Sequence, residues 1–268
     1  MNMKILVLLA MTSLILLSCF SAGCVEQTAS QTDVLADVIS SLHETLTTTA
    51  DEAAFASRYY AADPTPENGR QALATLYQRT TLTHDLLIAD ENGIVRAVYP
   101  NNIISALGQN LSSYPPNKEI FAGTDVYVSE YMVLENGMEA YLLSVPIKIS
   151  EEYAGYISLS FDPYRLFGPE EQKVFEKGYN LWVMQMNGVQ VFDADVSEAG
   201  ADLLNDPDYA MIREMAELVA ANPSGETKYV YTADIGTDVV EKTAVWDTLS
   251  FGETDWRVVL TSSAPVGS

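Results

Sequence analysis

The chain has 268 residues, of which 37 are acidic and 14 are lysine or arginine, giving a net charge of −23 at pH 7. This excess of negative charge would repel nucleic acid and anionic lipid headgroups, which excludes both as partners. Behind the N-terminal leader about 240 residues remain, enough for one large domain or two small ones.

The N-terminus has the order of residues expected of an export signal. One cation, Lys4, precedes an uninterrupted apolar run from Ile5 to Leu17, and small residues follow as far as Cys24. The apolar run is shorter than the ~20 residues that a helix needs to cross a bilayer. Residues 1–24 are therefore predicted to be a signal peptide.

The end of this signal predicts the site of a lipid anchor. Ser21-Ala22-Gly23-Cys24 resembles the lipobox of bacterial and archaeal lipoproteins, because small residues fit the narrow site of the peptidase. Leu16-Leu17-Ser18-Cys19 is a second candidate box, but a glycine directly before Cys24 favours Cys24. We expect an extracytoplasmic protein held at the cell membrane by a lipid on Cys24, without a disulfide or thiolate chemistry.

Two helices are predicted at residues 32–82, after a short polar tether at residues 25–31. From Val34 to Leu46 apolar residues recur every three or four positions, which places them on one stripe of a long helix. A proline-containing turn ends this helix. Thr65 followed by Pro66 then suits the N-cap and the first turn of the second helix.

From residue 83 the hydrophobic period changes from that of a helix to that of a strand. Residues 83–167 predict a hairpin, an irregular stretch with helical pieces and three more strands, with Asn-Gly pairs at tight turns. A charged connector at residues 168–178 leads to residues 179–263, where the same order repeats before a tail at residues 264–268. We therefore predict an α+β fold with a long N-terminal helix and two modules, each with an antiparallel sheet of about five strands.

Seven strings carry a resemblance to a known family: LLIADENGIVRAVYP at Leu86–Pro100, ALGQNLSSYP at Ala106–Pro115, YLLSVPI at Tyr141–Ile147, GYISLSFDPYRLF at Gly155–Phe167, NGVQVFDAD at Asn187–Asp195, AVWDTL at Ala244–Leu249 and DWRVVLT at Asp255–Thr261. In their order and spacing they resemble the double Cache sensor domains, extracytoplasmic relatives of PAS domains. The resemblance implies two PAS-like modules, a membrane-distal one that holds a small ligand and a membrane-proximal one, with the long helix packed along both.

The resemblance also implies how a signal would leave the protein. Members of the family usually continue into a transmembrane helix and a signalling domain, and the sequence shows neither after the second module. We therefore expect the signal to pass through a separate membrane receptor or transporter.

The candidate ligand site lies in the first module. Alternation along a strand at residues 125–133 places Tyr127, Ser129 and Tyr131 on one face, which can line a pocket. Arg96, on the hairpin of the same sheet, suits a ligand carboxylate because its planar guanidinium can hold two oxygens. Four more aromatic residues complete the predicted enclosure: Tyr99, Tyr114, Phe121 and Tyr141.

Alternatives to this site remain open. The tyrosines can be ordinary half-buried sheet residues and Arg96 a surface charge. Cache domains that bind amino acids carry an arginine and a Trp-Tyr pair before the middle strand and an aspartate in the last strand. Here residues 118–124 have neither arginine nor tryptophan, and Ser160 stands in the place of the aspartate. This argues against an amino acid and leaves a small carboxylate, another metabolite or no ligand.

Catalytic and metal-binding motifs find little support. His43 and His84 have no cysteine beyond the leader with which to build a zinc site, and no nucleophile elbow, phosphate loop or dinucleotide fingerprint occurs. The aspartates from Asp193 to Asp208 lack the glycine and glutamate positions of an EF-hand loop, so a solvated loop is favoured over a calcium site. We predict no enzymatic activity, no cofactor and no metal. The alternatives are a ligand-free structural or adhesive surface lipoprotein and, third, a secreted hydrolase with an acidic pair.

Overall fold

The structure is a computed structural model that describes residues 30–134, 137–232 and 239–263. Several predicted segments lie outside the described residues: the signal peptide with both candidate lipid sites, Cys19 and Cys24, most of the tether, and the tail at residues 264–268. Gln31–Ser268 forms one compact unit. In the described part of the chain, no helix combines the length and the apolar character needed to span a membrane.

Both predicted helices are present. The long helix α2 spans Gln31–Ala62, and Val34, Leu42 and Leu46 of its apolar stripe are each at most 1% exposed. Helix α3 spans Pro66–Arg79. Thr65 caps it as predicted, because its hydroxyl oxygen accepts a hydrogen bond from the backbone N–H of Asn68 at 3.3 Å.

The first module contains an antiparallel sheet of six strands within the described residues. These are β1 (Thr83–Asp90), β2 (Val95–Tyr99), β3 (Tyr127–Val128), β4 (Met132–Val133), β5 (Glu139–Ile149) and β6 (Glu152–Phe161). Their order across the sheet is β2-β1-β6-β5-β3, and β4 also pairs with β5. Two short 3-10 helices, η1 (Asn101–Ala106) and η2 (Ile120–Ala122), lie in the connection between β2 and β3.

The second module repeats this order with five strands in its described part. They are β7 (Asn180–Gln185), β8 (Gln190–Asp193), β9 (Gly225–Thr232), β10 (Val239–Phe251) and β11 (Thr254–Ser263), arranged as β8-β7-β11-β10-β9. The connection between β8 and β9 holds η3 (Val196–Glu198), η4 (Pro207–Tyr209) and helix α5 (Arg213–Ala221). Helix α4 (Pro163–Phe175) joins the modules, so much of the predicted connector is helical. The predicted α+β fold class is confirmed.

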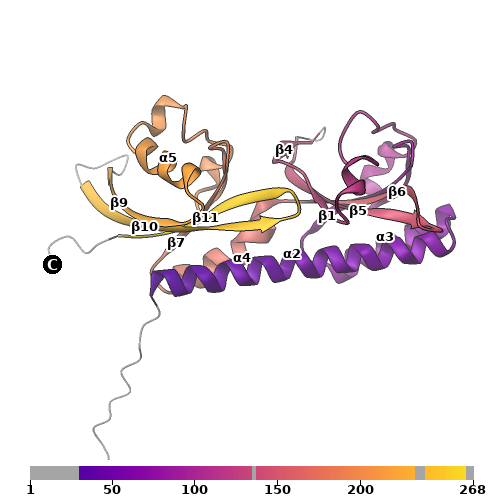
Figure 1. Cartoon of the computed structure of the whole chain (residues 1–268), viewed down its shortest axis with the longest axis horizontal. Helices are drawn as coiled ribbons and strands as arrows, with labels where there is room; N and C mark the ends of the chain where they lie inside the picture. Colours follow the sequence, from indigo (N-terminus) through magenta and orange to yellow (C-terminus); the bar gives the residue numbers. More distant parts are fainter. Residues whose placement is uncertain (1–29, 135–136, 233–238, 264–268) are drawn as a thin grey trace, which may run out of the picture. The chain divides into compact units, whose positions relative to one another are not determined.

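Each sheet has one face on the long helix and the other under its irregular connection. Leu143 of β5 and Val258 of β11 belong to one core with α2, which contacts both sheets. Trp182 of β7 points to the face of its sheet away from this core and packs with Met215 and Val219 of α5. Figure 1 shows α5, and the segment that follows β2, on the sides of their sheets away from α2. A site on that side would be enclosed by strands below and loops above.

A buried hydrogen bond joins the two sheets. The indole N–H of Trp256, on β11, donates to the hydroxyl of Tyr141, on β5, at 2.8 Å, and both side chains have 0% exposure. Tyr141 also stacks on Phe161, with ring centroids 5.5 Å apart. Burial raises the pKa of Tyr141, so the hydroxyl stays protonated. The sequence placed Tyr141 in a ligand pocket, whereas the structure places it in the core that both modules share.

We expect Tyr141→Phe to lower the free energy of unfolding by about 1–3 kcal/mol, because the Trp256 indole would remain buried without an acceptor. Denaturant unfolding of wild type and variant measures this loss. The double variant Tyr141→Phe/Trp256→Phe removes both partners, so its loss should be smaller than the sum of the two single losses. Strict additivity would show that the two side chains are not coupled.

Candidate functional site

A cavity of about 400 Å³ lies on the face of the first sheet that is turned away from α2. Its floor consists of residues of β1, β5 and β6 that alternate with the core residues of those strands. Its walls come from residues 103–116, in the connection after β2, and from Met132–Leu134. The cavity therefore occupies the space between the sheet and its irregular cover.

Hydroxyl groups and one carboxylate stand on this floor. Ser158 and Ser160 of β6 line the cavity, and Ser158 accepts a hydrogen bond from the hydroxyl of Ser144 at 2.8 Å. Asp85 of β1 lies directly across from Ser160 in the register of the sheet. The backbone N–H of Asp85 donates to the Ser160 hydroxyl at 3.2 Å. The last of these contacts fixes the backbone of Asp85 beside Ser160.

The Asp85 carboxylate is buried with incomplete compensation. Its side chain is 9% exposed, and Oδ1 accepts only a long hydrogen bond, 3.4 Å, from the amide of Asn102. Oδ2 lies 3.0 Å from Nδ1 of His84, although this contact lacks the geometry of a hydrogen bond. Among the described residues that line the cavity there is no lysine or arginine. Asp85 is thus the one charged residue among the described residues that line the cavity, and His84 is its ion-pair partner when the imidazole is protonated.

The rest of the lining is mainly apolar. Leu87, Leu142 and Met132 contribute aliphatic surface, and Tyr156 contributes a ring that is 3% exposed. Burial raises the pKa of Tyr156 to about 12, so its hydroxyl remains protonated and available as a donor. A cavity with much apolar surface and few polar groups is typical of a site for a small organic ligand.

The eight side chains predicted to line a pocket are not brought together. Tyr114 lines the cavity and is 64% exposed. Phe121 packs on the cavity residue Tyr156, with centroids 6.4 Å apart, and Tyr127 belongs to the same small cluster. Tyr99 lies edge-on against Tyr77 of α3, with centroids 5.1 Å apart. Of this group only Tyr114 touches the cavity directly.

The strand predicted over residues 125–133 is interrupted, which separates three of these side chains. The hydroxyl of Ser129 accepts from the backbone N–H of Leu142 at 2.9 Å and donates to the carbonyl of Glu130 at 2.8 Å. A side chain thus takes part in the strand pairing, and regular alternation stops there. Tyr131 donates to the Glu139 carboxylate at 2.6 Å; burial and this contact raise the pKa of Tyr131. The predicted face of Tyr127, Ser129 and Tyr131 is therefore not formed.

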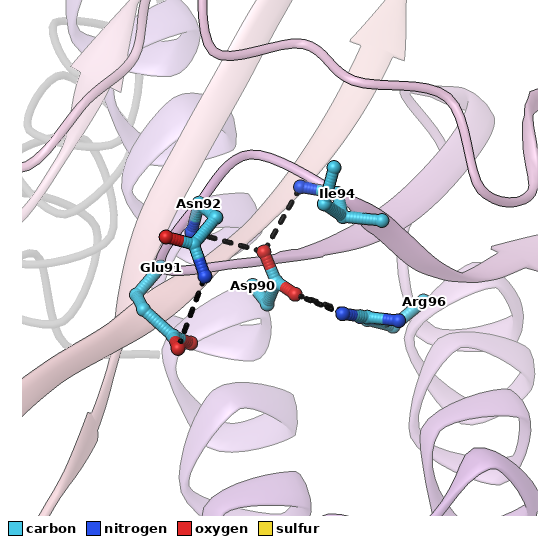
Figure 2. Close-up of polar contacts among 5 residues, drawn as sticks. All are labelled: Asp90, Glu91, Asn92, Ile94 and Arg96. Carbon is cyan, nitrogen blue, oxygen red and sulfur yellow. Dashed lines mark hydrogen bonds and ion pairs between the residues drawn. The ribbon is translucent and has the colours of Figure 1, made fainter.

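Arg96 is held by Asp90 and does not line the cavity. Its Nη2 lies 2.6 Å from Oδ2 of Asp90, and its Nε donates to the same oxygen at 2.7 Å (Figure 2). The other oxygen of Asp90 accepts from the backbone N–H groups of Asn92 and Ile94, each at 2.9 Å. The guanidinium is thus occupied within its own hairpin.

A β-bulge explains this position. Ile88 pairs with Ala97 and Ala89 with Val95, so the pairing of β1 and β2 passes over Arg96. An extra residue in one strand shifts the side to which its side chain points, which alternation in the sequence does not reveal. The expectation of a carboxylate ligand depended on Arg96. No lysine or arginine among the described residues that line the cavity takes the place of Arg96.

Asp85 is the residue that the sequence analysis did not single out. The pairing of β1 with β6 is also irregular, because His84 has no partner residue in the register. The imidazole of His84 lies beside the carboxylate of Asp85. A charged residue inside an otherwise apolar predicted strand was the available signal, because such a residue needs a special environment if the strand is buried.

The acidic loop is closed by its own hydrogen bonds. Asp195 accepts from the backbone of Ser197, Asp202 accepts from the side chain of Asn205, and Asp206 accepts from the backbone of Asp208. Within the described ranges, no group of three or more histidine, cysteine, aspartate or glutamate side chains is arranged to hold a metal ion. Oxygens of these three carboxylates are thus occupied by donors of the loop itself.

The pKa of Asp90 gives a test of the Arg96 pairing. Burial raises this pKa, but hydrogen bonds from Ile94, Arg96 and Asn92 outweigh burial and hold it below 3.8. A pKa that is lower in the folded chain stabilises the fold above the unfolded pKa, and this contribution is lost as the pH falls through the folded pKa. In Arg96→Gln the pKa of Asp90 should rise toward 3.8, as measured by NMR titration.

The matched control for this titration is Lys148→Gln, which removes an exposed cation paired with Asp125 in the same module. It should leave the pKa of Asp90 unchanged. An Asp90 pKa that responds equally to both substitutions would mean that the two cations act only through the net charge.

The comparisons with known proteins concern both the sequence and the fold. Residues 43–163 match the model of a family described as "HK/GC/Chemotaxis protein-like, sensor domain". The search of curated proteins finds no match.

Solved structures share the fold over most of the chain. An extracellular ligand binding receptor from Desulfohalobium retbaense DSM5692 has a TM-score of 0.70 at 18% identity, over 85% of this chain and 39% of the receptor, so this chain spans less than half of it. The ligand-binding domain of the Pseudomonas fluorescens chemoreceptor CtaA, in complex with L-alanine, has a TM-score of 0.62 at 11% identity. The match covers 87% of this chain and 95% of that domain. The ligand-binding domain of the Pseudomonas aeruginosa PAO1 amino acid chemoreceptor PctC, in complex with GABA, has a TM-score of 0.58 at 12% identity. The match covers 85% of this chain and 96% of that domain. At these identities the likeness establishes the fold alone.

Proposed function

We propose a sensing function on the premise that residues 43–163 are a sensor domain of the HK/GC/chemotaxis protein-like family and that the chain has the fold of Cache-type extracellular ligand-binding domains. The chain is an extracytoplasmic small-molecule sensing or binding protein of the double Cache type, without enzymatic activity. A lipid on Cys24 holds it at the membrane, and a separate membrane receptor or transporter receives its signal. The first-module cavity is the observation that carries this proposal.

The ligand of this cavity is a small organic cation with an apolar body. Asp85 supplies a buried negative charge whose neighbours, His84 and Asn102, compensate it only in part. Ser158 and Ser160 add hydroxyls, and the aliphatic wall accepts the body of the ligand. A charge-assisted hydrogen bond from an ammonium group to Asp85 would be short and strong because water is largely excluded.

The ligands of two relatives sharpen this choice. L-alanine, bound by CtaA, and GABA, bound by PctC, each carry an ammonium group and a carboxylate. The cavity here offers Asp85 to an ammonium group, whereas no arginine or lysine among its described lining residues would hold a carboxylate. We therefore favour an amine without a carboxylate over an amino acid.

Ligand binding is tested on the unit Gln31–Ser268 by thermal shift against matched sets of amines, amino acids and carboxylates. An amine should raise the melting temperature by mass action. Asp85→Asn should weaken its binding about tenfold to hundredfold, since it removes the charge-assisted partner. The control Asp125→Asn removes an 81% exposed carboxylate of the same module and should leave affinity unchanged.

Other outcomes of this screen decide against the proposal. A carboxylate ligand that binds Asp85→Asn as well as wild type would reject the assignment of the charge. The absence of any ligand would favour a structural or adhesive surface lipoprotein, and turnover of a ligand would favour a hydrolase.

The lipid anchor is tested in cells. Cys24→Ala should leave an unprocessed precursor without lipid, while Cys19→Ala should be processed and anchored normally. Mass spectrometry of the mature N-terminus and fractionation of membranes measure both. Normal lipidation of Cys24→Ala would move the anchor to Cys19.

A further inference from the structure

Three neighbouring strands form the floor of the first cavity, and their register places its side chains in rows. In one row Asp85 of β1 pairs with Ser160 of β6. In the next row Ser158 of β6 lies between Leu87 of β1 and Ser144 of β5. Neighbouring strands lie about 4.8 Å apart, and side chains on one face of a strand recur about every 7 Å. The sheet therefore holds the two serines at fixed distances from Asp85.

The two serine hydroxyls of β6 each accept a hydrogen bond from the protein. Ser158 accepts from the hydroxyl of Ser144 at 2.8 Å, and Ser160 accepts from the backbone N–H of Asp85 at 3.2 Å. A hydroxyl also has one proton to donate, and neither serine donates its proton to a residue that the structure describes. Their side chains are 5% and 4% exposed and line the cavity. The floor thus presents two donors to an occupant of the cavity.

These donors need an acceptor, which an ammonium group cannot provide because it has no lone pair. A carboxylate of the ligand has lone pairs, but it would face the negative charge of Asp85 and would find no lysine or arginine among the described lining residues. A neutral oxygen accepts from a hydroxyl without either cost. The two serines therefore favour a hydroxyl, ether or carbonyl oxygen on the ligand.

The second module differs at the corresponding place. A cavity of about 740 Å³ lies there, and none of its described lining residues is a serine. Its lining combines aromatic rings with one lysine and four carboxylates: Lys242, Asp193, Asp195, Glu198 and Asp208. The pair of serine donors therefore belongs to the first cavity.

We infer that the ligand of the first cavity is an amine that also carries a neutral oxygen, such as an amino alcohol, and that Ser158 and Ser160 select this oxygen. The role of the two serines rests on the proposed function, in which an ammonium group binds to Asp85. The spacing of the strands suits about two or three carbon atoms between the nitrogen and the oxygen. Leu87 and Leu142 of the lining contact these carbon atoms.

The test compares three probes of similar length on the full-length chain, solubilised in detergent: 3-amino-1-propanol, n-butylamine and β-alanine. Calorimetric titration measures the affinity of each. 3-Amino-1-propanol should bind about tenfold more tightly than n-butylamine, whose methyl group leaves the serine donors unpaired. It should also bind more tightly than β-alanine, because the described lining offers the carboxylate no cation.

Ser158→Ala and Ser160→Ala should each reduce the preference for 3-amino-1-propanol over n-butylamine to about twofold, because each removes one donor. The affinity for n-butylamine should stay unchanged, whereas damage to the fold would weaken the binding of both amines. The matched control is Ser57→Ala. It removes a hydroxyl of α2 that is 4% exposed, donates to the carbonyl of Pro146 at 2.7 Å and does not line the cavity, so the preference should remain.

The possible failures of the serine assignment and of the proposed function are distinct. Equal affinity of the wild type for the two amines, or a preference that survives in both serine variants, would overturn the role of the serines and leave the proposed function intact. Tightest binding of β-alanine would show that the hydroxyls hold a carboxylate and would overturn the neutral oxygen. Binding of neither amine would reject the proposed function and, with it, the role of the serines.

Discussion

The packing of one helix against two sheets is the constraint on which the rest of the structure depends. The apolar stripe of α2 is buried over its length and contributes to a core with β5 of the first module and β10 of the second. One face of each sheet is thereby filled with side chains. A ligand can be enclosed only on the opposite face, under the irregular connection of each module, and both cavities lie there.

The two cavities share a position and differ in chemistry. In the first, one carboxylate stands in a largely apolar space, with hydroxyls of β6 beside it. In the second, four carboxylates and a lysine surround aromatic rings. The same strand order therefore supports two cavities with different linings, because the residues that alternate away from the core are free to vary without disturbing the packing on α2.

Two irregularities in strand β1 and its partners decide which charges reach the first cavity. A bulge in β2 pairs Arg96 with Asp90, and a skipped residue in β1 sets His84 beside Asp85. Alternation predicts side-chain direction only where the pairing is regular, so neither placement followed from the sequence. Of the predicted site residues, Tyr114 lines the first-module cavity, whereas Arg96 does not; the charged residue of its described lining is Asp85.

The sequence by itself determined the local structure: the long helix from its apolar period, the cap at Thr65, the hairpin turns from Asn-Gly pairs, and the repeated order of elements that defines the fold class. These features depend on neighbours along the chain. Only the tertiary structure decided that Tyr141 bonds to Trp256 in the core and that Asp85 meets Ser160 on a cavity floor. Those pairs are 115 and 75 residues apart. They depend on register, bulges and burial, which the sequence encodes without any local signal.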